Sequence, residues 1–198
     1  MPVPVLFRTE LAACSTRPFS GRCHRVVALE SYLNASAPSL LFDLGPKISK
    51  EGQRFSPPGD HRGLYVSTGL ETAGSEFASS KRHWRSGQCP KHVVSDMSVR
   101  LASVLDLTSA TVRRTLRISK EQVLSPWNGF ASLNGGIWPV TWILGHHSFE
   151  SGRFDGILFP SNRDPAGTCL LVFTERLVEG STHVIIHKED GSVWERLP

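Results

Sequence analysis

Five side chains of this sequence combine the types needed to bind a charged small molecule and act on it: Arg25, Arg54, Tyr65, Glu76 and Ser161. An arginine offers a fork of donors that stays charged and can hold a phosphate bidentately. A carboxylate can stabilise positive charge that develops as a bond breaks. A tyrosine ring can stack on a cationic ring, and a serine hydroxyl can bind a ligand or orient a carboxylate.

Each of these residue types also has an ordinary structural use. Arg54 could form an ion pair in a loop, Tyr65 could be a half-buried strand residue, and Glu76 could be a solvated carboxylate on a helix. Ser161 could simply form a turn after a proline. No Gly-x-Ser-x-Gly elbow surrounds Ser161, so we assign it to binding and not to nucleophilic attack. Taken singly, the structural use is the more common one for each residue.

Short strands and helices are expected to carry these residues. Apolar or alternating runs predict strands over His24–Leu29, Leu64–Ser67, Val93–Leu107, Gly156–Pro160, Thr168–Thr174 and Thr182–His187, the last of these opening a closing hairpin. Helices are predicted over Glu71–Lys81 with Thr68 as a candidate N-cap, over Ala110–Ile118, over Ser119–Leu124, and over Ile137–Phe149 as a buried helix. Residues 34–63 are rich in Ser, Pro and Gly and predict a long functional loop inside one domain. The fold class is therefore α+β.

Length and composition agree with one globular domain. The chain has 198 residues, a hydrophobic fraction of 39% and a charged fraction of 20%. Its formal net charge is +4, but no run of basic residues is long enough for a nucleic-acid arm. The charge suits an anionic small molecule or an acidic partner, and we expect no direct contact with nucleic acid.

Cysteine and histidine usage predicts no metal site. The four cysteines, Cys14, Cys23, Cys89 and Cys169, form no Cys-x-x-Cys pair, which favours a reducing cytoplasm over a zinc site or a disulfide framework. The adjacent His146 and His147 would point about 100° apart on a helix, too far to share one metal. Trp127, Trp138 and Trp142 are expected in the core. The N-terminus lacks the order of a signal peptide, and no apolar run of about 18 residues predicts a membrane span.

Four short patterns occur in a characteristic order. They are Gly52-Gln53-Arg54-Phe55-Ser56-Pro57, Gly63-Leu64-Tyr65-Val66-Ser67, Glu71-Thr72-Ala73-Gly74-Ser75-Glu76, and the later stretch from Phe154 to Asp164. With the upstream His24-Arg25-Val26-Val27, this series resembles the RES domain over residues 20–178. The resemblance implies an N-terminal extension over residues 1–19, the RES domain over 20–178, and a C-terminal hairpin over 179–198 that completes the same domain.

The resemblance also implies a fold, a substrate and a partner. RES domains resemble compact ADP-ribosyltransferases, with a central mixed or antiparallel split sheet flanked by helices and NAD bound as substrate in a cleft. Glu76 would then stabilise the ribosyl cation, Arg54 and Arg25 would bind the pyrophosphate, Tyr65 would stack on nicotinamide, and Ser161 would bind the ligand or orient Glu76. The family further implies the toxin of a type II toxin–antitoxin system, with a protein antitoxin over the cleft.

Several alternatives stay open at this point. NAD could be broken by water or by phosphate, or its ADP-ribose could pass to a protein acceptor. A domain that binds a nucleotide or a partner without turnover is an alternative of another class. Arg8 competes with Arg25 for the place of the upstream arginine, because the long segment between Arg25 and Arg54 departs from the plainest family pattern.

Overall fold

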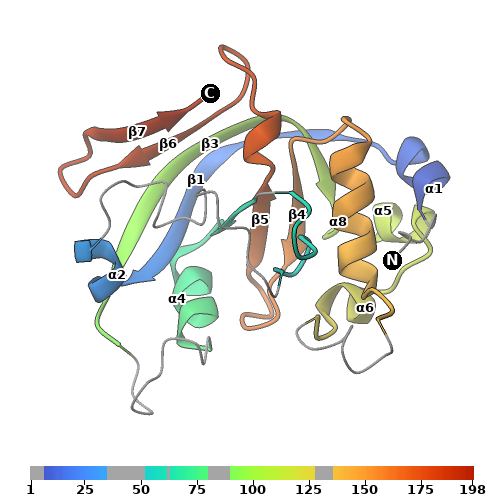
Figure 1. The fold of residues 1–198 in the computed structure, drawn as a ribbon, viewed down its shortest axis with the longest axis horizontal. Coiled ribbons are helices and arrows are strands. Elements are labelled where there is room, and N and C mark those ends of the chain that lie inside the picture. Colours follow the sequence, from blue (N-terminus) through green and yellow to red (C-terminus); the bar gives the residue numbers. More distant parts are fainter. Residues whose placement is uncertain (1–6, 35–51, 62, 80–89, 128–135) are drawn as a thin grey trace.

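A mixed sheet and the helices around it form the fold in the computed structural model, which describes residues 7–34, 52–61, 63–79, 90–127 and 136–198 (Figure 1). The strands are β1 (Arg17–Ala28), β2 (Leu64–Ser67), β3 (His92–Asp106), β4 (Gly156–Pro160), β5 (Thr168–Val172), β6 (His183–His187) and β7 (Val193–Leu197). The helices are α1 (Arg8–Ala13), α2 (Leu29–Asn34), α4 (Leu70–Ala78), α5 (Ala110–Thr115), α6 (Lys120–Leu124), α8 (Val140–Glu150) and the 3-10 helix η2 (Thr174–Arg176). The predicted α+β class, with a mixed central sheet flanked by helices, is confirmed.

The sheet has the strand order β1-β2-β5-β4-β3-β6-β7, and β1 also pairs with β3. Only the β3–β4 pair is parallel; every other pair among these strands is antiparallel. Because β1 pairs with both β2 and β3, the strands β1, β2, β5, β4 and β3 form a closed circuit. β1 and β2 meet at one bridge, His24 opposite Ser67, whereas β1 follows β3 along most of its length.

Alternation along the sequence explains the long strand β3. Met97, Val99 and Leu101 are buried, while the intervening Ser98 and Arg100 face outward, as the two-residue period of a strand requires. In contrast, every residue of β4 and nearly every residue of β5 is buried. Such continuous apolar strands belong in the middle of a layered fold, between elements on both faces.

α8 packs against α1, α6 and β4, and is drawn in orange beside β4 in Figure 1. It begins at Val140 and not at the predicted Ile137, because Pro139 keeps an extended backbone at the N-cap position. A residue that precedes proline also avoids the helical region, so the helix cannot extend backward through Trp138. Ile137 is correspondingly 66% exposed.

α4 follows β2 after a short turn, and its N-cap is Gly69. The prediction of Thr68 as N-cap is wrong, because the Thr68 hydroxyl donates instead to the carbonyl of Thr168, the first residue of β5. The predicted helix end at Lys81 lies outside the described residues. So do residues 35–51 and 62 of the predicted long loop, while residues 52–61 form a turn closed by a bridge between Gln53 and Ser56.

The predicted C-terminal hairpin is confirmed as β6 and β7, with Gly191 in the left-handed conformation at its turn. At the other end of the chain, Leu11 of α1 is buried in the same hydrophobic cluster as Leu144 of α8. The Arg153 guanidinium donates to the carbonyls of Leu11 and Ala12 and so ties the end of α1 to the body.

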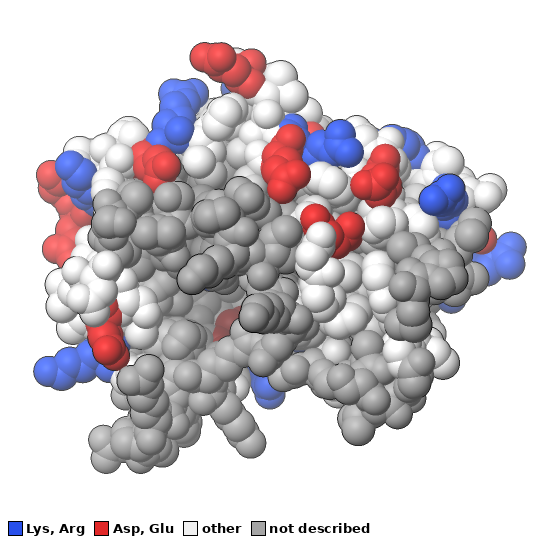
Figure 2. All heavy atoms as spheres, viewed as in Figure 1, with Lys and Arg blue, Asp and Glu red and all other residues white. Residues whose placement is uncertain are grey.

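On the face drawn in Figure 2, acidic and basic side chains are interspersed among the described residues. No helix in the described ranges has the length and apolarity that crossing a bilayer requires.

Candidate functional site

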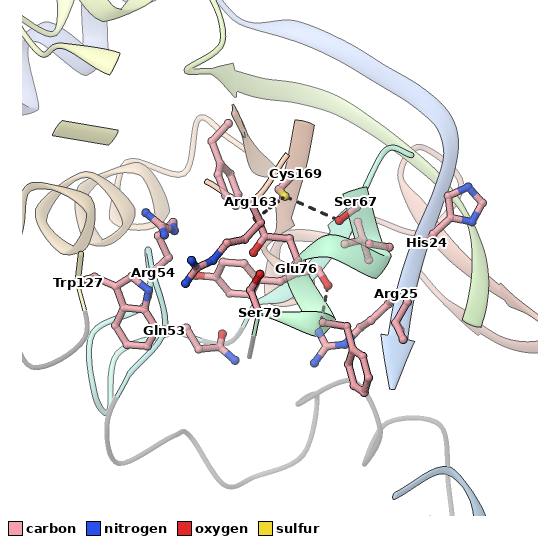
Figure 3. A pocket seen from close by; sticks show the side chains of 16 residues that line it. His24, Arg25, Gln53, Arg54, Ser67, Glu76, Ser79, Trp127, Arg163 and Cys169 are labelled. Carbon is pink, nitrogen blue, oxygen red and sulfur yellow. Dashed lines mark hydrogen bonds between the residues drawn. The ribbon is translucent and has the colours of Figure 1, made fainter. Parts of the chain in front are cut away.

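A cavity of about 540 Å³ lies between β1, β2, α4 and the turn that precedes β2. Its lining is formed by His24, Arg25, Val26, Gln53, Arg54, Tyr65, Val66, Ser67, Ala73, Glu76, Phe77, Ser79, Trp127, Phe159, Arg163 and Cys169. Four of the five predicted site residues are therefore brought together in one cavity, although they come from four separate segments (Figure 3). The fifth, Ser161, lies directly behind the lining and contacts Glu76.

The turn that carries Arg54 is clamped onto α8. The indole Nε1 of Trp142 donates to the Gln53 carbonyl at 2.7 Å. Gly145, one turn further along the helix, leaves the space that the Phe55 carbonyl occupies, since a Cβ at this position would collide with that oxygen. Two contacts to consecutive turns of one helix thus set the path of the backbone on both sides of Arg54.

The guanidinium of Arg54 donates to two backbone carbonyls at the end of α6, those of Val123 at 3.1 Å and Ser125 at 3.3 Å. Burial lowers the pKa of Arg54 from its ordinary value, the carboxylate of Glu76 opposes that shift, and the positive charge of Arg163 adds to it. With Arg25, three guanidinium groups and one carboxylate line the cavity, a balance that favours an anionic ligand.

Arg25 extends from β1 and donates to the Tyr65 carbonyl on β2 at 3.0 Å. In Figure 3, Arg25 and His24 lie at one end of the cavity, and Arg54 and Trp127 lie at the other. Arg8, the rival upstream arginine, is an exposed residue of α1 and is not among the residues that line the cavity.

Tyr65 contributes its ring to the cavity wall, edge-on to Phe159 with 6.4 Å between centroids. Its hydroxyl oxygen accepts the backbone N–H of Phe55 at 2.9 Å and lies 3.3 Å from the Ser56 Oγ. Burial raises the pKa of Tyr65 to about 12 despite these hydrogen bonds. The phenol therefore stays protonated at neutral pH. This suits a role in positioning a ligand and does not suit a role as a base.

Glu76 and Ser161 form a direct pair. The Ser161 hydroxyl, 3% exposed, donates to Glu76 Oε1 at 2.6 Å and accepts the backbone N–H groups of Arg163 and Asp164, both at 3.0 Å. One turn earlier on α4, the Thr72 hydroxyl donates to Asp164 Oδ2 at 2.6 Å. The turn after β4 is thus joined to α4 at two points, and the Glu76 carboxylate is held in one orientation.

Three lining residues outside the predicted set bear on the chemistry of the cavity. Arg163 lies in the turn after Ser161, a position that could border the cleft but that turn propensity also explains. Trp127 was expected in the core but lines the cavity, whereas Trp142 is buried as predicted. The Cys169 thiol lies 3.9 Å from Glu76 Oε1, and burial, together with that carboxylate, raises its pKa to about 12. A cysteine in an apolar strand carries no local signal for such a place.

Within the described ranges, no group of three or more His, Cys, Asp or Glu side chains is arranged to hold a metal ion. His146 and His147, predicted to diverge on a helix, do so: His147 is buried, while His146 is half-buried and reaches toward Asp60.

Comparison with known proteins identifies the family. A chain of the solved structure titled "Crystal structure of the M.tuberculosis MbcT-MbcA toxin-antitoxin complex" is similar with a TM-score of 0.61 and 14% identity, over 98% of this chain and 92% of that one. At this identity the likeness shows a shared fold. No curated protein matches the sequence. The family model of the RES domain matches residues 22–194, which include all five predicted site residues, and the chain therefore belongs to the RES domain family.

Proposed function

We propose that the protein consumes NAD by cleaving the bond between nicotinamide and ribose. The observation that carries this proposal is the Glu76 carboxylate, oriented by Ser161 at the wall of a cavity that also holds the guanidinium groups of Arg25, Arg54 and Arg163. Membership of the RES domain family supports an NAD-like substrate.

The arginines are suited to the pyrophosphate. Arg54 is half-buried, and its charge is offset in part by Glu76 and opposed by Arg163. A pyrophosphate between Arg54 and Arg163 would relieve the repulsion between their two guanidinium groups. It would also accept hydrogen bonds from the Arg54 N–H groups that do not donate to the two carbonyls at the end of α6. Arg25 at the other end of the cavity would bind a second polar part of the same molecule.

The reaction itself needs little beyond placement and charge. When the bond from the ribose carbon to the nicotinamide nitrogen breaks, its electron pair leaves with nicotinamide, which becomes neutral, and the ribose carbon becomes cationic. The Glu76 carboxylate would stabilise that cation. Water, or inorganic phosphate, then forms the new bond to carbon on the ribose; in the case of water, a proton is released and ADP-ribose is the product.

We further propose that this activity is that of a toxin paired with a protein antitoxin. The fold is shared with a chain of a toxin–antitoxin complex, and a protein that covers the cavity would stop NAD from entering it. Transfer of ADP-ribose to a protein acceptor would use the same donor site and differs only in what attacks the ribose carbon.

The first experiment incubates purified protein with NAD, in buffer with and without phosphate, and follows nicotinamide release by chromatography. Glu76→Gln keeps the size of the side chain and removes its charge, and should abolish release. Glu71→Gln is the matched control, since Glu71 is exposed in the first turn of the same helix. A phosphate requirement would identify phosphorolysis. Absence of release in both buffers would refute cleavage of free NAD, and labelled NAD added to a lysate would then test protein modification.

A cellular experiment tests the toxin. Induced expression in bacteria should lower intracellular NAD and arrest growth, and Glu76→Gln should do neither at the same protein level. Growth arrest with unchanged NAD would contradict the proposed substrate.

A further inference from the structure

A buried series of hydrogen bonds leads from Tyr65 away from the cavity. The Tyr65 hydroxyl lies 3.3 Å from Ser56 Oγ, which lies 3.1 Å from His61 Nε2. His61 Nδ1 in turn lies 2.8 Å from Asp60 Oδ2. Ser56 is 3% exposed and the His61 side chain is fully buried, so the contact between them is shielded from water, whereas the Asp60 side chain is 18% exposed. The Ser56–His61 and His61–Asp60 distances are those of ordinary hydrogen bonds, and the Tyr65–Ser56 distance is longer than is usual between two hydroxyl groups.

The far end of the series is anchored on α8. His146 Nδ1 lies 3.0 Å and 3.1 Å from the two carboxylate oxygens of Asp60. Burial alone would raise the pKa of Asp60, but hydrogen bonds from His61 and His146 hold it below its ordinary value. Asp60 is therefore an anion that accepts from both imidazoles.

Aromatic rings hold His61 in place. Its ring is stacked on Phe149 with 4.8 Å between centroids and 14° between planes, and meets Phe173 edge-on at 5.0 Å. The imidazole can neither tilt nor turn without disturbing two core rings. Its two nitrogens thus stay directed at Ser56 and Asp60.

The order Ser56, His61, Asp60 is that of a serine hydrolase triad, but the environment is different. Ser56 is not among the residues that line the cavity, and an almost fully buried hydroxyl gives a substrate carbonyl no approach. The described geometry assigns the three residues to support and not to nucleophilic attack.

The donors and acceptors fit in one direction. Asp60 only accepts, so in the neutral form of His61 the proton is on Nδ1 and Nε2 accepts from the Ser56 hydroxyl. The Ser56 oxygen then accepts the Tyr65 O–H, and the Tyr65 oxygen accepts the backbone N–H of Phe55. The tyrosine proton consequently points toward Ser56 and away from the cavity.

We propose that Ser56, His61 and Asp60 are positioning residues for Tyr65, which hold its ring at one angle in the cavity wall and keep its hydroxyl proton directed away from the ligand. This inference deepens the proposed NAD site and rests on it for its effect on activity. Its structural part, the restraint on Tyr65, can be measured without NAD.

The chain offers a direct probe, because its only tyrosines are Tyr32 and Tyr65. Protein labelled with 3-fluorotyrosine should give two fluorine resonances, and Tyr32→Phe assigns them. Ser56→Ala should shift the Tyr65 resonance and leave that of Tyr32, which packs on Trp194. Ser98→Ala is the matched control, since it breaks another serine-to-imidazole contact, Ser98 Oγ to His187 Nε2 at 2.8 Å. It should not shift the Tyr65 or the Tyr32 resonance as Ser56→Ala shifts that of Tyr65.

Activity gives the second measurement. His61→Leu removes both nitrogens and should lower kcat for NAD cleavage by about 10-fold, as loss of a supporting hydrogen bond does in other sites. His61→Gln keeps one acceptor and one donor and should restore part of that loss, which a purely steric role of His61 would not predict. Ser56→Ala changes a single atom and serves if the His61 variants fail to fold.

The outcomes separate the two proposals. If wild-type protein leaves NAD intact while Ser56→Ala shifts the Tyr65 resonance, the restraint on Tyr65 stands and the proposed substrate fails. If wild-type protein cleaves NAD while Ser56→Ala and His61→Leu leave the Tyr65 resonance unchanged, the positioning role is refuted.

Discussion

Replacing Ser161 by alanine tests the link between the turn after β4 and the Glu76 carboxylate. The change removes one oxygen that donates to Glu76 Oε1 at 2.6 Å and accepts two backbone N–H groups at 3.0 Å. A hydrogen bond to a charged group contributes about 1.5–3 kcal/mol, and we expect the lower end, about 1.5 kcal/mol, because Glu76 is partly exposed. In a domain of this size that loss lowers Tm by about 3–6 °C.

The larger effect is expected on catalysis. Without its donor the carboxylate can turn away from the ribose carbon, and a displacement of about 1 Å can reduce turnover by about 100-fold. We therefore expect kcat for nicotinamide release to fall by about 10- to 100-fold in Ser161→Ala, measured under saturating NAD at a temperature where the variant is folded.

Ser109→Ala is the matched control for stability. Ser109 is the N-cap of α5, and its side chain accepts the N–H of Val112, remote from the residues that line the cavity. It should lower the free energy of unfolding by about 1 kcal/mol and leave kcat unchanged. Equal turnover in Ser161→Ala and wild type would refute the reasoning that Ser161 orients a catalytic Glu76.

Three further predictions concern other parts of the structure. Gly145→Ala would drive a Cβ into the Phe55 carbonyl and should cost about 3 kcal/mol in unfolding free energy, measured by urea denaturation, whereas the same change at Gly74, where a Cβ meets open space, should be neutral or stabilising. Arg54→Lys loses the planar fork and should weaken ADP-ribose binding by about 10-fold or more in calorimetry, with the fold unchanged by circular dichroism. Burial raises the pKa of Cys169 to about 12 from 9.0, so the folded state binds the thiol proton more tightly than the unfolded chain does; the resulting stability is present below pH 9 and is lost as the pH rises toward 12. Cys169→Ala should therefore reduce the decrease in urea midpoint at alkaline pH. An unchanged dependence of the urea midpoint on pH would contradict the raised pKa of Cys169.

The sequence predicts well those elements whose pattern is local. β3, β4 and the C-terminal hairpin have alternating or continuous apolar runs, and the structure has them within a residue or two of the expected bounds. β1 is different: its predicted part began at His24, but the strand starts at Arg17. The first half, Arg-Pro-Phe-Ser-Gly-Arg, is polar and contains a proline, and it is extended because it pairs with β3, a contact that no local pattern reveals.

The same limit applies to the site. Arg54, Tyr65 and Glu76 lie in short patterns close together in the sequence, so the pattern order was enough to nominate them. The contact between Ser161 and Glu76 joins residues 85 positions apart, and local motifs give only the residue types and not the 2.6 Å distance. His61 illustrates the opposite case, since a single histidine among prolines and glycines gives no sign that it connects Tyr65 to α8.

The closed circuit of β1, β2, β5, β4 and β3 has one narrow join, the bridge between His24 and Ser67, and this join lies in the wall of the cavity. We call the β1–β2 junction at this bridge the seam. Because it has the fewest paired residues of the circuit, it is where the sheet can separate with the smallest loss of hydrogen bonds. A ligand that spans from Arg25 on β1 to Tyr65 on β2 would act as a clasp across that seam. Ligand binding would then also make the closed circuit of strands more rigid. A partner that separated β1 from β2 at the seam would release the ligand without occupying the ligand's own place in the cavity.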